Sequence, residues 1–145
     1  MGALILPLSG HVYIDTQSVI YSVEKHPVYW PILQPLWQAL KRGSVELFSS
    51  ELTLLETLVG PYKARNSLLE VTYEQLLSST EVRLLPITPE ILRGAARLRA
   101  DFNLRTPDAI HAATAHEHAS DLFITNDSIF QRVPDLPLIL LNDLL

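Results

Sequence analysis

The chain contains no cysteine among its 145 residues. This absence excludes a disulfide framework, a thiolate zinc site, an iron–sulfur cluster and a cysteine nucleophile. The five glycines form no phosphate-binding loop, so nucleotide hydrolysis of the P-loop type is also excluded. No serine lies in a nucleophile-elbow motif, and the histidines lack the His-Glu-x-x-His spacing of a zinc protease.

Basic side chains are in the minority, with 11 Lys and Arg against 16 Asp and Glu and a formal net charge of −5. This balance argues against nonspecific coating of nucleic acid, but it permits a nucleic-acid substrate held by a local patch or through metal ions. Residues 1–14 lack the basic start of a signal peptide, and the uncharged run 28–40 is shorter than a membrane span of ~20 residues. We therefore expect a cytoplasmic protein that does not enter a membrane.

The length of 145 residues fits one domain, and the hydrophobic content of 48% indicates a packed core. We expect a single domain over residues 1–145, with residues 1–11 as a flexible N-terminal tail. Short apolar segments at 12–14, 45–48, 82–87, 122–125 and 137–141 are typical of strands. Helices are expected at 17–25, from 31 or 35 to 42, from 50 to about 58, at 62–77, at 89–102 and at 106–118, with Gly60-Pro61 as a break. This alternation predicts a three-layer α/β/α sandwich with a mostly parallel central sheet of about five strands.

Four carboxylates fall on one rim of this predicted sheet. Asp15 and Asp127 follow strands, Asp108 begins the helix before the fourth strand, and Glu56 lies on the helix after the second strand. Ligands of open α/β sheets bind beyond the carboxyl ends of the strands, so all four would meet at the working edge. Two like charges ~5 Å apart repel by about 3 kcal/mol at an effective dielectric near 20. A cation would relieve this repulsion, and oxygen ligands favour Mg²⁺ or Mn²⁺, the ions of phosphoryl-transfer sites.

Each carboxylate also has a purely structural interpretation. Asp108 could complement a helix dipole, Asp15 could cap the next helix, and residues 125–127 could form only a turn. Glu56 could complete a capping box with Thr53. These interpretations account for each acid singly, but they do not account for four acids on one rim.

Four segments resemble the acidic motifs of PIN domains, in the family's order. They are Val12-Tyr13-Ile14-Asp15-Thr16, Ser50-Glu51-Leu52-Thr53-Leu54-Leu55-Glu56, Thr106-Pro107-Asp108-Ala109-Ile110-His111-Ala112-Ala113-Thr114-Ala115 and Phe123-Ile124-Thr125-Asn126-Asp127. The resemblance covers about residues 12–141, and the third motif is the most specific. Among PIN proteins the chain is similar to small toxins of VapC type. That resemblance implies a Mg²⁺- or Mn²⁺-dependent endoribonuclease that cleaves RNA, is inhibited by an antitoxin and forms a homodimer.

The resemblance also implies roles for individual residues. The catalytic residues and metal ligands would be Asp15, Glu56, Asp108 and Asp127. Thr16 and Thr125 would support them through their hydroxyls. Gln17 departs from the pattern, because the family commonly has Asn or Ser at that position.

Three arginines, Arg93, Arg97 and Arg105, are candidates for contacts with RNA phosphates. The simpler interpretation of the first two is a solvent-exposed helix face paired with Glu90 and Asp101. His111 is expected to pack beside the sheet. Trp30 and Trp37, with nearby leucines, indicate core or a surface for a partner rather than a platform for bases.

Two other functions compete with the nuclease. A noncatalytic PIN-like interaction module is one, although its signature would be a lost carboxylate and none is lost. A phosphoacceptor signalling domain is the other, but it needs a lysine after the last strand, and residues 128–145 contain none.

Overall fold

The structure is a computed structural model that describes residue 4 and residues 10–145. Most of the expected N-terminal tail therefore lies outside the described residues, but His11 already belongs to the first strand. The elements, in chain order, are β1 (His11–Ile14), α1 (Thr16–Val23), α2 (Trp30–Lys41), β2 (Glu46–Ser50), α3 (Leu52–Ala64), α4 (Ser67–Leu77), β3 (Val82–Leu85), α5 (Pro89–Phe102), α6 (Thr106–Glu117), β4 (Leu122–Thr125) and β5 (Leu138–Leu140). Two short 3₁₀ helices follow β4 and β5, at Ser128–Arg132 and Leu141–Leu144.

The five strands form one parallel sheet in the order β3-β2-β1-β4-β5. β1 lies at its centre, with Tyr13 paired to Phe48 of β2 and to Phe123 of β4. Side chains of a strand alternate between the two faces, so Val12 and Ile14 enter one core while Tyr13 enters the other. All three are fully buried, which explains why β1 is apolar at every inner position.

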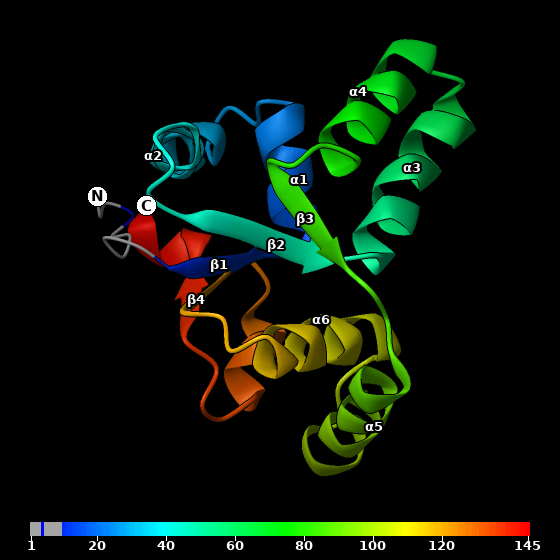
Figure 1. Cartoon of the computed structure of the whole chain (residues 1–145), viewed down its shortest axis with the longest axis vertical. Helices are drawn as coiled ribbons and strands as arrows, with labels where there is room; N and C mark the ends of the chain where they lie inside the picture. The colour runs from blue at the N-terminus through cyan, green and yellow to red at the C-terminus, as the bar shows by residue number, and fades with distance from the viewer. Residues whose placement is uncertain (1–3, 5–9) are drawn as a thin grey trace.

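Helices cover both faces of the sheet, as the sequence predicts for a three-layer α/β/α sandwich (Figure 1). Residues of α1, α2, α3 and α4 fill the core on one face, with Leu33, Leu36 and Tyr73 among its fully buried members. Residues of α5, α6 and the 3₁₀ helix Ser128–Arg132 fill the core on the other face. Within the described residues, no helix is both long and apolar enough to cross a membrane.

The order in which the chain adds strands to the sheet changes direction at the boundary between the neighbouring strands β1 and β4. The first three strands run outward from β1 to β3, and β4 then returns to the other side of β1. A crevice therefore lies beyond the carboxyl ends of β1 and β4. Such a crevice is the usual ligand position in doubly wound sheets. The two strands remain paired up to this crevice, because the Asp15 amide donates to the Ile124 carbonyl at 3.2 Å.

Local signals in the sequence set several helix ends correctly. Thr88 caps α5 by accepting a hydrogen bond from the Ile91 amide at 3.2 Å, and Pro89 is the first helical residue. Gly43 follows α2 with φ +75°, a left-handed conformation in which a side chain would be strained. α6 begins at the predicted Thr106, and Arg105 holds the cap position.

The expected break at Gly60-Pro61 is wrong. α3 continues through both residues to Ala64, and Pro61 is buried in its last turn. A proline there removes a single helical hydrogen bond, and its apolar ring is buried in exchange. The helix ends one turn later at Arg65, whose φ of 51° reverses the chain. Asn66 then starts α4, because its side chain accepts from the Leu69 amide at 3.1 Å.

Candidate active site

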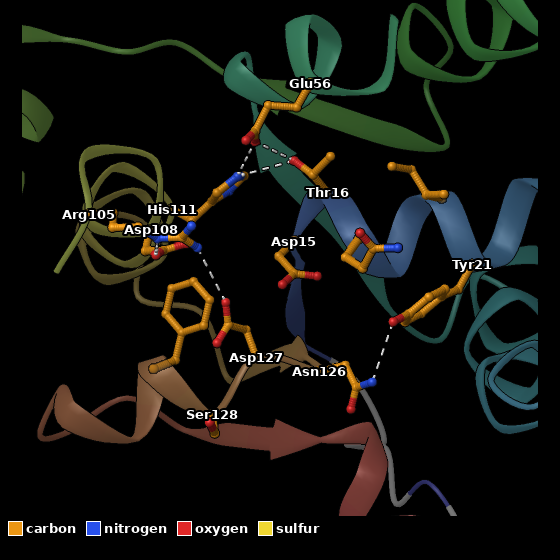
Figure 2. A pocket seen from close by; sticks show the side chains of 13 residues that line it. Asp15, Thr16, Tyr21, Glu56, Arg105, Asp108, His111, Asn126, Asp127 and Ser128 are labelled. Carbon is orange, nitrogen blue, oxygen red and sulfur yellow. Dashed lines mark hydrogen bonds and ion pairs between the residues drawn. The ribbon is translucent and has the colours of Figure 1, made fainter. Parts of the chain in front are cut away.

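An open cavity of about 540 Å³ lies at the crevice between β1 and β4. Figure 2 shows that its walls come from β1 and α1, from α3, from α6 and from the segment after β4. All four carboxylates that the sequence singles out line it: Asp15, Glu56, Asp108 and Asp127. The topology brings them together from positions more than 100 residues apart, because every one of them stands at the same rim of the sheet.

Asp15 lies at the floor of the cavity and is almost fully buried, with 5% of its surface exposed. Its Oδ1 accepts from the Ser18 amide at 3.0 Å and so caps α1. Its Oδ2 accepts from the Thr125 hydroxyl at 2.5 Å. Burial raises the pKa of Asp15 above its ordinary value, although the hydrogen bonds from Thr125 and Ser18 act in the opposite direction. Ionised Asp15 is therefore costly, and a cation nearby would stabilise it.

Glu56 lies on α3 at the opposite wall and faces two donors. The Thr16 hydroxyl donates to its Oε1 at 2.7 Å, and the His111 Nε2 lies 2.9 Å from the same oxygen. Burial alone would raise the pKa of Glu56, but the bonds from His111 and Thr16 and the charge of Arg105 outweigh it and lower that pKa. Glu56 is therefore a carboxylate at neutral pH.

Asp108 and Asp127 share one cation, the Arg105 guanidinium. Arg105 Nε lies 3.0 Å from Asp108 Oδ2, and a second nitrogen of the same group lies 3.7 Å from Asp127 Oδ2. Asp108 is buried at the first turn of α6, while Arg105 is largely exposed. These two carboxylates raise the pKa of Arg105, chiefly through the hydrogen bond to Asp108, so the guanidinium stays charged.

The structural interpretations of the acids are partly correct. Asp15 caps α1, and Asp127 caps the 3₁₀ helix Ser128–Arg132 by accepting from the Ile129 amide at 3.0 Å. In both residues Oδ1 makes the cap. The other oxygen, Oδ2, is left for Thr125 in the case of Asp15 and for Arg105 in the case of Asp127. Glu56 belongs to no capping box, because α3 already begins at Leu52 and the carboxylate binds Thr16 instead. The acids thus serve the local fold and the cavity at the same time.

The cavity has the chemistry of a site for a hard divalent cation. Four carboxylate side chains line it. Asp15, one of the four, has no salt bridge to a basic side chain among the described residues. Within residue 4 and residues 10–145, however, no three His, Asp or Glu side chains converge closely enough to hold an ion as they stand. Arg105 lies between two of the carboxylates, and carboxylate oxygens are the kind of ligand that Mg²⁺ and Mn²⁺ prefer.

The remaining candidates divide between the cavity and other surfaces. Thr16 and Arg105 line the cavity, and Thr125 lies beneath it with its hydroxyl on Asp15. Arg93 and Arg97 do not line it: both are exposed on α5, and Arg93 pairs with Glu90 at 3.9 Å, as the simpler interpretation expected for that arginine.

Sequence reasoning missed the position of His111, which is buried as expected but belongs to the site. Its Nε2 lies against Glu56, and its Nδ1 lies 2.6 Å from the Tyr13 hydroxyl. One signal was present in the sequence. His111 follows Asp108 by three residues on α6, and this spacing places both side chains on one face of the helix.

The fold and the site together define a doubly wound α/β domain with an acidic cavity at its switch point. The chain belongs to the PIN domain family, whose model matches residues 12–136. This family assignment therefore replaces the phosphoacceptor signalling domain that the sequence analysis considered as an alternative. No curated protein matches the chain in a sequence comparison.

Solved structures show the same fold at low sequence identity. VapBC2 from Rickettsia felis, bound to a DNA fragment from its promoter, matches with a TM-score of 0.71 and 20% identity over 88% of this chain and 97% of that chain. VapBC-1 from nontypeable Haemophilus influenzae matches with a TM-score of 0.70 and 18% identity over 91% and 98% of the two chains. VapC20 from Mycobacterium tuberculosis, described as a sarcin–ricin loop cleaving toxin, matches with a TM-score of 0.70 and 16% identity over 83% and 92%.

Proposed function

We propose that this protein is a Mg²⁺- or Mn²⁺-dependent endoribonuclease, the toxin of a type II toxin–antitoxin pair. One observation carries the proposal: four carboxylates of a PIN domain line a single cavity, and the most buried of them, Asp15, has no basic partner among the described residues. RNA as the substrate rests on family membership and on the likeness to VapC20, which is described as cleaving the sarcin–ricin loop.

In this proposal Asp15, Asp108 and Asp127 hold the cation, directly or through water, and Glu56 completes the set. Bound Mg²⁺ or Mn²⁺ would activate water and neutralise negative charge at the scissile phosphate. Thr125 and the Ser18 amide hold Asp15 in one orientation. Thr16 does the same for Glu56, which remains an ionised proton acceptor because its pKa is lowered.

Arg105 has a second role in the proposed reaction. If Asp108 and Asp127 held a cation, the Arg105 guanidinium would lose these two carboxylate partners and its charge would be unpaired at the rim of the cavity. Phosphate oxygens are the natural partners of such a group. A chain with net charge −5 can therefore bind RNA locally at this rim.

The proposed partners are an antitoxin and a second copy of the chain. The VapBC proteins are a family of toxin–antitoxin systems, and solved VapBC structures share this fold. An exposed apolar surface supports the proposal: Leu55, Val59 and Tyr62 form a stripe on α3, and Leu68 and Val71 lie on α4. Both RNA and antitoxin would place the protein in the cytoplasm.

The noncatalytic interaction module is the second candidate, because Arg105 fills the space between two carboxylates and no cation site is preformed among the described residues. Purified protein free of any partner, incubated with a panel of structured RNAs in Mg²⁺, Mn²⁺ or EDTA, separates the two. Cleavage in the metal lanes alone supports the nuclease. Absence of cleavage together with absence of Mn²⁺ binding in calorimetry supports the interaction module.

A further inference from the structure

A buried chain of hydrogen bonds connects the core of the protein to the active-site cavity. It starts at Tyr13, a fully buried residue on the face of β1 that packs against α6. The Tyr13 hydroxyl lies 2.6 Å from Nδ1 of His111, which is itself only 4% exposed. On the other side of the ring, Nε2 lies 2.9 Å from Glu56 Oε1 and 3.2 Å from the Thr16 hydroxyl (Figure 2).

The positions of the protons in this chain follow from the acceptors. An ionised carboxylate only accepts, and Thr16 already donates to Oε1 of Glu56. The His111 Nε2 must therefore carry a hydrogen, since a bare lone pair 2.9 Å from that oxygen would be repelled. Nδ1 of the same ring lies 2.6 Å from the Tyr13 hydroxyl, and no other hydrogen-bond partner of Nδ1 occurs among the described residues. Burial keeps that hydroxyl protonated, because it raises the pKa of Tyr13 well above its ordinary value.

The arrangement treats the two oxygens of Glu56 differently. Thr16 and His111 both contact Oε1, whereas Oε2 takes no hydrogen bond among the described residues. A carboxylate clamped through one oxygen presents the other in a fixed direction. The clamp is rigid, because the ring of His111 is held at both nitrogens and lies edge-on to Tyr13, with ring centroids 5.9 Å apart. Tyr13 in turn stacks on Phe123 of the neighbouring strand at 5.0 Å.

We propose that Tyr13 and His111 are positioning residues of the active site: the Tyr13 hydroxyl holds the His111 ring through its contact with Nδ1, and Nε2 of that ring holds Glu56 with one oxygen directed at the cavity. The inference rests on the proposed function, in which Glu56 belongs to the metal-binding set. Outer residues of this kind orient the ligands of a metal, and their loss typically costs about 10- to 100-fold in metal affinity or activity.

Mn²⁺ binding measured by calorimetry on the purified full chain tests the proposal. Tyr13→Phe removes the hydroxyl that contacts Nδ1 of His111 and should weaken Mn²⁺ binding about 10-fold. Tyr73→Phe is the matched control, because Tyr73 is also fully buried and donates to Glu24 at 2.6 Å on the opposite face of the sheet. That control should bind Mn²⁺ within about twofold of the wild type, and circular dichroism checks that both variants are folded.

Substitutions of His111 separate positioning from packing. His111→Leu fills the space without a donor and should weaken Mn²⁺ binding as Tyr13→Phe does. His111→Gln can present an N–H near the position of Nε2 and should restore most of the affinity. In the His111→Gln background, Tyr13→Phe should add little, because the contact between the Tyr13 hydroxyl and Nδ1 is already lost.

The ¹⁵N chemical shifts of His111 in metal-free protein give a second readout. Tyr13→Phe should change the Nδ1 shift, because the hydroxyl that contacts this nitrogen is removed, whereas Tyr73→Phe should leave both ring shifts unchanged. A wild type that binds no Mn²⁺ would contradict the proposed function itself. If the wild type binds Mn²⁺ and Tyr13→Phe binds it as tightly as the wild type or as Tyr73→Phe, only the positioning role would be overturned.

Discussion

Thr125 supports Asp15 beneath the active site, and its replacement by valine gives a prediction with a definite size. Thr125 is fully buried, so Thr125→Val keeps the volume and removes the hydroxyl. Two bonds are lost: the one donated to Asp15 Oδ2 at 2.5 Å and the one accepted from the Asp127 amide at 3.0 Å. A hydrogen bond to a charged group is worth about 1.5–3 kcal/mol and a neutral one about 0.5–1.5 kcal/mol. We therefore expect a loss of about 2–4 kcal/mol in the free energy of unfolding, or a fall in Tm of roughly 5–15 °C.

The loss should depend on pH, because the bond from Thr125 lowers the pKa of Asp15 while burial raises it. Without that bond the pKa rises further, so the folded variant holds its proton to higher pH. A group whose folded pKa is raised contributes stability below its unfolded pKa and loses it as pH rises. The deficit of Thr125→Val should therefore grow as pH rises through the folded pKa of Asp15, which lies above the ordinary value of 3.8 for aspartate.

Urea unfolding in EDTA at pH 4.5, 6.0 and 7.5, followed by circular dichroism, measures this deficit. Thr114→Val is the matched control: Thr114 is also fully buried, but its hydroxyl donates to the Ile110 carbonyl within its own helix. Thr114→Val should lose less free energy of unfolding than Thr125→Val, and its loss should not depend on pH. Equal losses for the two variants, or a deficit at Thr125 that does not change with pH, would refute the role assigned to Thr125.

Three further predictions concern the cavity and the partner surface. Asp15→Asn should gain stability relative to the wild type as pH rises above 3.8 in EDTA, because it removes a buried charge whose pKa is raised; a pH-independent difference in urea unfolding would contradict this. Arg105→Gln should bind Mn²⁺ about two- to fivefold more tightly in calorimetry, since the cation no longer competes with the guanidinium, and Arg93→Gln should be neutral. Leu68→Glu, at a side chain that is 79% exposed, should weaken self-association in sedimentation without loss of fold, whereas Leu92→Glu on α5 should not. A monomeric wild type would count against the homodimer, and an unaffected Leu68→Glu against the surface.

The sequence alone was sufficient to predict the parallel sheet and the rim of that sheet at which the carboxylates meet. β4 has the predicted bounds, and α5 begins at the predicted Pro89, because apolar runs and helix starts are local features. The convergence of the four carboxylates also followed from topology, since parallel strands end at one edge.

Other features depend on tertiary contacts that local patterns do not encode. Pro61 is tolerated because it is buried, and the turn after α3 uses Arg65 in a left-handed conformation where glycine or asparagine is usual. The pairing of Arg105 with Asp108 and Asp127 joins α6 to the segment after β4, which no sequence period reveals. His111 was placed in the core correctly, but its bond to Glu56 spans 55 positions in the chain.

The most direct test of the account compares the initial rate of RNA cleavage by the wild type and by Asp108→Asn at saturating Mn²⁺, with EDTA as the metal-free reference. Asp101→Asn, at an exposed position on α5, is the matched control for the substitution. We expect metal-dependent cleavage by the wild type and by Asp101→Asn, and at least a hundredfold slower cleavage by Asp108→Asn with its fold intact, a loss of roughly the size seen when one key catalytic group is removed. Cleavage by Asp108→Asn at the wild-type rate, or cleavage that persists in EDTA, would contradict the proposed active site.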